Sequence, residues 1–94
     1  MMSNTQMVLR VAQMVRKYEQ TVNMMHNVSK EDTVLRYFTT LNNYEDDVMC
    51  VIDYVATLPE GEKTVARMAK YVVLMEQAKE KLYNNYFEKL AIIL

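Results

Sequence analysis

The sequence predicts an all-α protein that folds as an antiparallel three-helix bundle of long helices. Two observations lead to this prediction. Apolar residues recur at alternating steps of three and four along three long segments, and the 94 residues include only one Gly and one Pro. The recurrence places apolar side chains on one face of a helix, and the scarcity of turn residues indicates few, long elements. We expect a single domain over residues 1–94, large enough for one core.

The first helix is predicted at about residues 4–27. Its Ser3 and Gln6 have the spacing of a capping box, and Met2 and Met7 are placed to form a hydrophobic staple around it. The predicted core face of this helix is a stripe of Val8, Val11, Val15, Tyr18, Val22 and Met25.

The second helix is predicted at about residues 30–57, with Ser29 as its N-cap and acidic residues in its first turn. Four of the five residues at 39–43 are poor helix formers, but the apolar stripe continues through them in register. We therefore expect one continuous helix there. The stripe consists of Val34, Tyr37, Leu41, Tyr44, Val48, Val51, Val55 and Leu58.

The third helix is predicted at about residues 60–94, with Pro59 placed at its first position because proline suits a helix start. Its stripe skips Lys79 and consists of Val65, Met68, Val72, Met75, Leu82, Tyr86, Leu90 and Ile93. Short connections place neighbouring helices antiparallel. Helices of these lengths span roughly 36–50 Å, so the molecule is expected to be elongated.

Composition narrows the functional classes. The net charge is −1, and nucleic-acid-binding domains usually carry a basic excess, so a nucleic-acid partner is not expected. The single cysteine cannot form an internal disulfide, which favours a reducing, cytoplasmic setting. No apolar stretch approaches the roughly 20 residues that span a bilayer, and no membrane partner is expected.

No catalytic, metal or cofactor site is predicted, and we expect a protein that is not an enzyme. His26 is the only histidine, and neighbouring Ser29 is expected to be a helix cap rather than a nucleophile. Glu45, Asp46 and Asp47 are consecutive, so their side chains diverge by about 100° per residue on a helix. We interpret these three carboxylates as a solvated face rather than a cation site.

Cysteine, methionine and tyrosine are the remaining residues of interest. Cys50 flanks the second stripe and is expected to be a half-buried, unreactive thiol. Nine methionines and seven tyrosines suit either a core or an adaptable binding surface. These two possibilities stay open for the residues that lie off the stripes, namely Met24, Met49, Tyr54, Tyr71 and Tyr83.

A row of cations on the third helix supports the alternative function, a DNA-associated transcriptional regulator, possibly of a phage type. Lys63, Arg67 and Lys70 share one face, as phosphate binding requires. Residues 51–71 also look like the approach to the sigma-type helix-turn-helix of phage late regulators, although residues 72–94 lack the turn and recognition helix that complete this motif. Acidic residues flank the row, which favours an ordinary mixed surface instead.

The C-terminal end is the predicted partner site. Residues 90–94 are all apolar and cover every side of a helix, so one bundle can bury only part of them. We expect a small, non-catalytic helical interaction or adaptor protein that self-associates, with a homodimer expected, and that modulates a larger protein partner. The predicted partner-binding residues are Tyr86, Phe87, Leu90, Ile92, Ile93 and Leu94. The alternative for this segment is that it folds back over residues 27–29 of the same chain.

Overall fold

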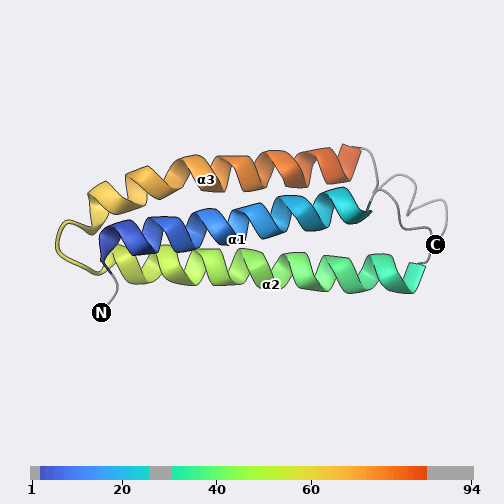
Figure 1. Cartoon of the computed structure of the whole chain (residues 1–94), viewed down its shortest axis with the longest axis horizontal. Coiled ribbons are helices and arrows are strands. Elements are labelled where there is room, and N and C mark those ends of the chain that lie inside the picture. The colour runs from blue at the N-terminus through green and yellow to red at the C-terminus, as the bar shows by residue number, and fades with distance from the viewer. Residues whose placement is uncertain (1–2, 26–30, 85–94) are drawn as a thin grey trace.

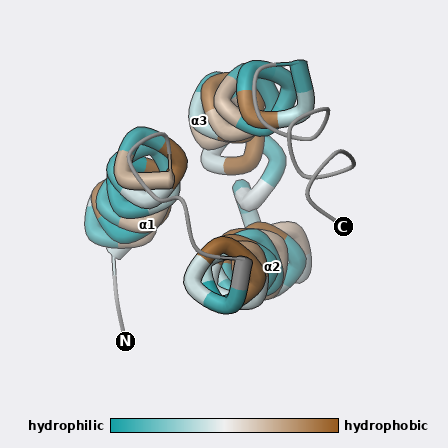
Figure 2. The backbone as a smooth tube through the Cα atoms, turned by 90° about the vertical axis from the view of Figure 1, so that its right-hand side faces the viewer, coloured by the Kyte–Doolittle hydropathy of each residue, from teal (hydrophilic) through white to brown (hydrophobic). Residues whose placement is uncertain are grey.

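The computed structural model describes residues 3–25 and 31–84, and this part of the chain forms three helices and no strand. They are α1 (Asn4–Met25), α2 (Glu31–Ala56) and α3 (Gly61–Leu82). Figure 1 shows that α1 and α3 run in one direction and α2 in the other. The molecule is more than twice as long as it is wide, and Figure 2 shows the helices at the corners of a triangle. The predicted all-α, elongated three-helix fold is confirmed.

The three predicted stripes meet along the axis of this triangle. All six stripe residues of α1 are buried, and in α2 and α3 buried stripe residues alternate with half-buried ones. The fully buried stripe residues of α2 and α3 are Val34, Leu41, Val48, Val55, Met68, Met75 and Leu82. The alternating steps of three and four therefore marked the buried face of each helix, because each stripe keeps one helical face towards its two neighbours.

The N-terminus of α1 has the capping box that its sequence predicts. The Ser3 amide donates to Gln6 Oε1 at 2.8 Å, and the Gln6 amide donates to Ser3 Oγ at 3.2 Å. These bonds satisfy two backbone donors that have no partner inside the helix. Met7, one half of the predicted staple, is buried, and its partner Met2 lies outside the described residues.

Helix α2 is continuous through its weakest segment, residues 39–43, as predicted. The Thr39 and Thr40 hydroxyls donate to the carbonyl oxygens of Leu35 and Arg36, one turn earlier, at 3.2 and 3.1 Å. Such bonds satisfy the threonine side chains within the helix. Because Leu41 is buried in the middle of this segment, tertiary packing outweighs the poor local propensity.

The turn between α2 and α3 corrects one prediction. Pro59 is not the first residue of the third helix but lies in the turn, and α3 begins at Gly61. The Gly61 amide donates to the Leu58 carbonyl at 3.0 Å, and Glu60 has the left-handed values φ 65° and ψ 8°. Proline followed by a residue with positive φ is the pattern of a type II turn. The chain forms this turn rather than starting a helix at Pro59, because the turn pairs the Gly61 amide with the Leu58 carbonyl oxygen.

Gly61 is required by the same turn. A Cβ at this position would overlap the carbonyl oxygen of Val55 in the last turn of α2. Only glycine allows the start of α3 to lie this close to the end of α2.

The outer helix ends predicted at residues 27 and 94 lie outside the described residues. Helix α2 is described from Glu31, one residue after the predicted start. Tyr83 still has helical backbone angles, φ −60° and ψ −45°, so the helical path continues past Leu82.

Candidate interaction surfaces

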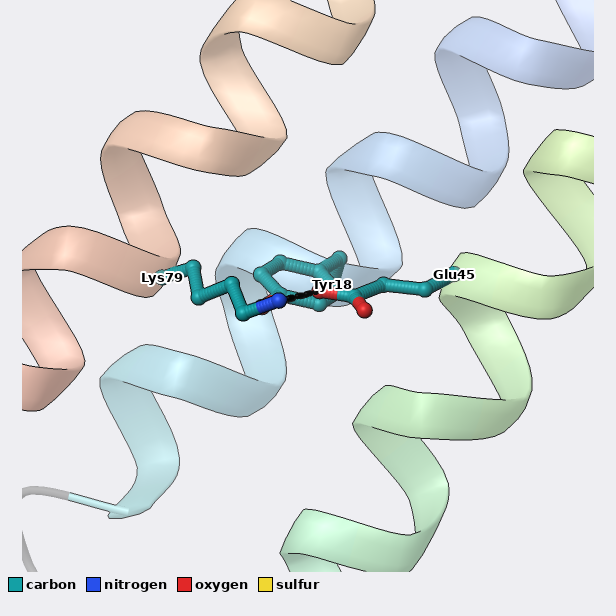
Figure 3. Close-up of polar contacts among 3 residues, drawn as sticks. All are labelled: Tyr18, Glu45 and Lys79. Atoms are coloured by element: carbon teal, nitrogen blue, oxygen red, sulfur yellow. Dashed lines mark hydrogen bonds and ion pairs between the residues drawn. The ribbon is translucent and has the colours of Figure 1, made fainter.

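One polar cluster joins all three helices of the bundle. The Tyr18 hydroxyl of α1 donates to Glu45 Oε1 of α2 at 3.1 Å, and Lys79 Nζ of α3 lies 3.4 Å from the same oxygen. Figure 3 shows the three side chains converging, each from a different helix. The Tyr18 residue is 1% exposed, whereas the side chains of Glu45 and Lys79 are 20% and 33% exposed.

The cluster shifts the titration of two of its members. Burial raises the pKa of Tyr18 well above its ordinary value of 10.0, and the Glu45 carboxylate raises it further. Burial alone would lower the pKa of Lys79, but the carboxylates of Glu45 and Glu76 raise it overall. At neutral pH the phenol is therefore protonated and the ammonium charged. A phenol whose pKa lies far above neutral pH stays protonated and is a poor general base. The cluster is therefore better suited to holding the three helices together than to transferring protons.

The sequence prediction missed this cluster. Asp46 and Asp47 are exposed, as the solvated-face interpretation requires, but Glu45 is partly buried and bonded to two other helices. That interpretation was wrong for Glu45. The sequence feature that pointed to this cluster was Lys79, which interrupts an otherwise apolar stripe. A cation on the inward face of a helix needs an oppositely charged or polar partner.

Four of the five off-stripe residues are exposed, so the core interpretation is wrong for them. Met24, Met49, Tyr54 and Tyr83 are exposed by 43–53%, and only Tyr71 is half-buried. The structure adds four further exposed apolar residues that the sequence analysis did not single out, namely Leu9, Leu35, Val73 and Leu74.

The prediction for Cys50 is also wrong, because this residue is exposed rather than half-buried. Val48 and Val51 point inward on α2. Because successive helical residues are rotated by about 100°, the side chain at position 50 points away from the bundle axis. The cysteine lines a hollow of about 250 Å³ between α1 and α2, together with Met7, Arg10 and Tyr54.

The outward face of α2 carries a second heptad-spaced row, which we call the outer α2 stripe. All of its residues are exposed, it includes three carboxylates and two large apolar side chains, and it contains no cation. It consists of Asp32, Leu35, Thr39, Asn42, Asp46, Met49, Asp53 and Ala56.

Helix α3 carries a matching row, which we call the outer α3 stripe. It extends the predicted basic row of Lys63, Arg67 and Lys70 by three exposed residues, Leu74, Gln77 and Lys81. This stripe has four cations and no carboxylate. Lys70 also lies over the ring of Tyr71, with its Nζ 4.9 Å from the ring centre.

Several predicted features lie outside the described residues and stay predictions. They are His26, the Ser29 cap and the whole partner segment of Tyr86, Phe87, Leu90, Ile92, Ile93 and Leu94.

Within residues 3–25 and 31–84, no three Cys, His, Asp or Glu side chains are placed to share a metal ion. None of the three described helices combines the length and apolar content needed to cross a membrane. Comparison with protein-family models, curated proteins and solved structures finds no match to this chain.

Proposed function

We propose that the chain is a non-catalytic helical interaction protein that self-associates, with a homodimer as its smallest assembly, and that modulates a larger protein partner. The observation that carries this proposal is the exposure of eight large apolar side chains, 44–57% for seven of them and 43% for Tyr83. The exposed thiol of Cys50 would remain reduced in the cytoplasm, where we place the protein.

Single exposed apolar residues are ordinary, but several in one row need an explanation. Leu35 and Met49 lie in the same outer stripe of α2, and Val73 and Leu74 lie next to each other on α3. Methionine and tyrosine, which supply half of the eight, suit surfaces that adapt to a partner. This distribution supports binding to another protein surface.

The C-terminal residues 86–94 remain the proposed contact with a partner or a second copy. Tyr83 brings an exposed aromatic ring to the end of α3 immediately before them. Their apolar content would extend the exposed apolar surface of that end of the bundle.

Mass measurement by light scattering tests the proposal, using full-length protein and a variant that ends at residue 89. We expect the full-length mass to exceed that of the 11.1 kDa chain at high micromolar concentration. We also expect the truncated chain to capture less partner protein from a lysate than the full-length chain does. A monomer at every concentration contradicts self-association, and unchanged capture removes the C-terminal segment from the site.

The second candidate function is that of a DNA-associated regulator, and the outer α3 stripe favours it. Its four exposed cations lie between residues 63 and 81 of one helix and no member of the stripe is a carboxylate, which makes a longer basic row than the three residues first noted. If all four neutralised phosphates, the logarithm of the DNA affinity would fall with the logarithm of salt concentration with a slope of about −3 to −4. A fluorescence anisotropy titration at several salt concentrations distinguishes this candidate from the adaptor.

A further inference from the structure

We propose that copies of this chain contact one another by docking the outer α2 stripe of one copy along the outer α3 stripe of the next. This inference rests on the proposed self-association and says which surfaces produce it. In this arrangement residues 86–94 would contact the larger partner rather than a second copy.

The two stripes match in spacing. Both alternate steps of three and four residues, so each forms a nearly straight ridge along its helix. Each also carries exposed apolar side chains within the ridge, Leu35 and Met49 on α2 and Leu74 on α3. Two helices with such ridges can pack side by side with their apolar residues covered and their charged residues at the edges.

The two stripes are opposite in charge. Asp32, Asp46 and Asp53 face outward on α2, and the four cations of the outer α3 stripe face outward on α3. Between the described residues, the ion pair found is that of Lys79 with Glu45, and it uses a member of neither stripe. Apart from Lys70, which lies over the ring of Tyr71, the charges of both stripes can face an opposite surface, and complementary surfaces attract and orient each other.

An antiparallel arrangement can bring two carboxylates of the outer α2 stripe opposite two cations of the outer α3 stripe. When Asp46 is placed opposite Arg67, Asp32 lies opposite Lys81, because both helices then advance by the same 14 residues. The same alignment places Thr39 opposite Leu74. This direction is also the one in which α2 and α3 pack within one copy.

The outer α3 stripe borders a hollow that a helix can cover. Leu74, Gln77 and Lys81 line it from α3, and Glu19 and Asn23 line it from α1, enclosing about 260 Å³. The carboxylate of Glu19 is the unfavourable group for an acidic helix here. Glu62, Glu76 and Glu80 are further exposed carboxylates of α3 beside the stripe, so the attraction to an acidic helix comes from the four cations of the stripe itself.

The two stripes belong to different sides of the bundle. The outer α2 stripe points away from the axis, whereas the outer α3 stripe lies beside the hollow between α1 and α3. A contact between two different surfaces is heterologous, and it gives a ring if the rotation between copies closes and an open filament if it does not. The proposal therefore predicts assemblies that grow beyond two copies as the concentration rises.

Charge reversal tests the pairing directly in the full-length chain. One variant carries Asp32→Lys and Asp46→Lys, and the other carries Arg67→Glu and Lys81→Glu. Each should self-associate at least about tenfold more weakly than the wild type, because both charge pairs of the contact now consist of like charges. Mixing the two variants should restore association, since each reversed stripe then meets an opposite one.

Matched controls make the same changes of net charge on exposed residues outside the stripes. They are Asp47→Lys with Glu80→Lys, and Arg10→Glu with Lys17→Glu. Both controls should associate like the wild type in sedimentation velocity at low salt, and circular dichroism should show that every variant keeps its helical content. The variant that ends at residue 89 should also self-associate like the wild type.

The outcomes separate this inference from the proposed function. Association that the stripe variants leave unchanged overturns the inference but keeps a self-associating protein. Failure of the mixed variants to recover association overturns it as well. A wild type that stays monomeric overturns both. If the Arg67 and Lys81 reversal abolishes salt-dependent DNA binding while the mass is unchanged, the outer α3 stripe is a phosphate surface and the inference is wrong.

Discussion

Replacing Tyr18 with Phe removes one hydroxyl from the polar cluster that joins the three helices. The hydroxyl donates to Glu45 at 3.1 Å from an almost fully buried ring. A hydrogen bond to a charged group contributes about 1.5–3 kcal/mol. Glu45 keeps Lys79 and some contact with water, so the loss should lie near the lower end. We expect a destabilisation of about 1–2 kcal/mol, which lowers Tm by roughly 4–16 °C in a domain of this size.

The stability that the Tyr18→Phe variant loses relative to the wild type should depend on pH. The folded-state pKa of Tyr18 is raised above its ordinary value of 10.0, so its contribution to stability is complete below pH 10 and declines above it. The unfolded phenol ionises there while the folded one stays protonated. The wild type should therefore lose about 1 kcal/mol between pH 10 and 11 that the Phe variant does not lose. The stability difference between the two proteins should narrow over this range.

Urea unfolding followed by circular dichroism at pH 8 and pH 11 measures both effects. Tyr44→Phe is the matched control, because Tyr44 is a half-buried tyrosine of α2 whose hydroxyl makes no hydrogen bond to the described residues. Its stability should change by less than about 0.5 kcal/mol. The reasoning fails if the two Phe variants are equally stable relative to the wild type, or if the Tyr18 difference does not narrow with pH.

Three further predictions concern the fold, and thermal unfolding measures all of them. Gly61→Ala should destabilise the protein by more than about 2 kcal/mol, because the added Cβ would overlap the backbone of α2. Glu60→Asn should stabilise it by about 0.5–1 kcal/mol, because Asn tolerates the left-handed conformation better than Glu. Equal effects of the two substitutions would contradict the assigned turn. Leu41→Asp should unfold the chain, since an unpaired buried charge costs several kcal/mol, while exposed Asp46→Ala should be nearly silent. Ser3→Ala should cost about 1 kcal/mol through loss of the capping box, and an unchanged Tm would show that the cap contributes nothing.

The core was predictable because one helical period determines which side chains face inward. Val11, Val15 and Val48, for example, are each no more than 1% exposed, and all three belong to predicted stripes. The capping box at Ser3 was equally readable, since it depends on residues three apart in the sequence. These features are local, and neighbouring helices only reinforce them.

Features that depend on contacts between helices were not predictable in the same way. Glu45 looked like its exposed neighbours Asp46 and Asp47 until two other helices supplied a phenol and an ammonium group. The turn was misassigned because Pro59 suits both a helix start and a type II turn, and only the close approach of Gly61 to α2 selects the second. The outer stripes became visible once burial had shown which apolar residues the core leaves out.

The central claim is that this bundle binds other copies of itself. Sedimentation equilibrium of the full-length protein, from low to high micromolar concentration, tests it most directly. We predict an average mass that rises with concentration above that of the 11.1 kDa chain and falls again at high salt, because charged stripes contribute to the contact. A mass that equals that of the single chain over the whole range would contradict the claim.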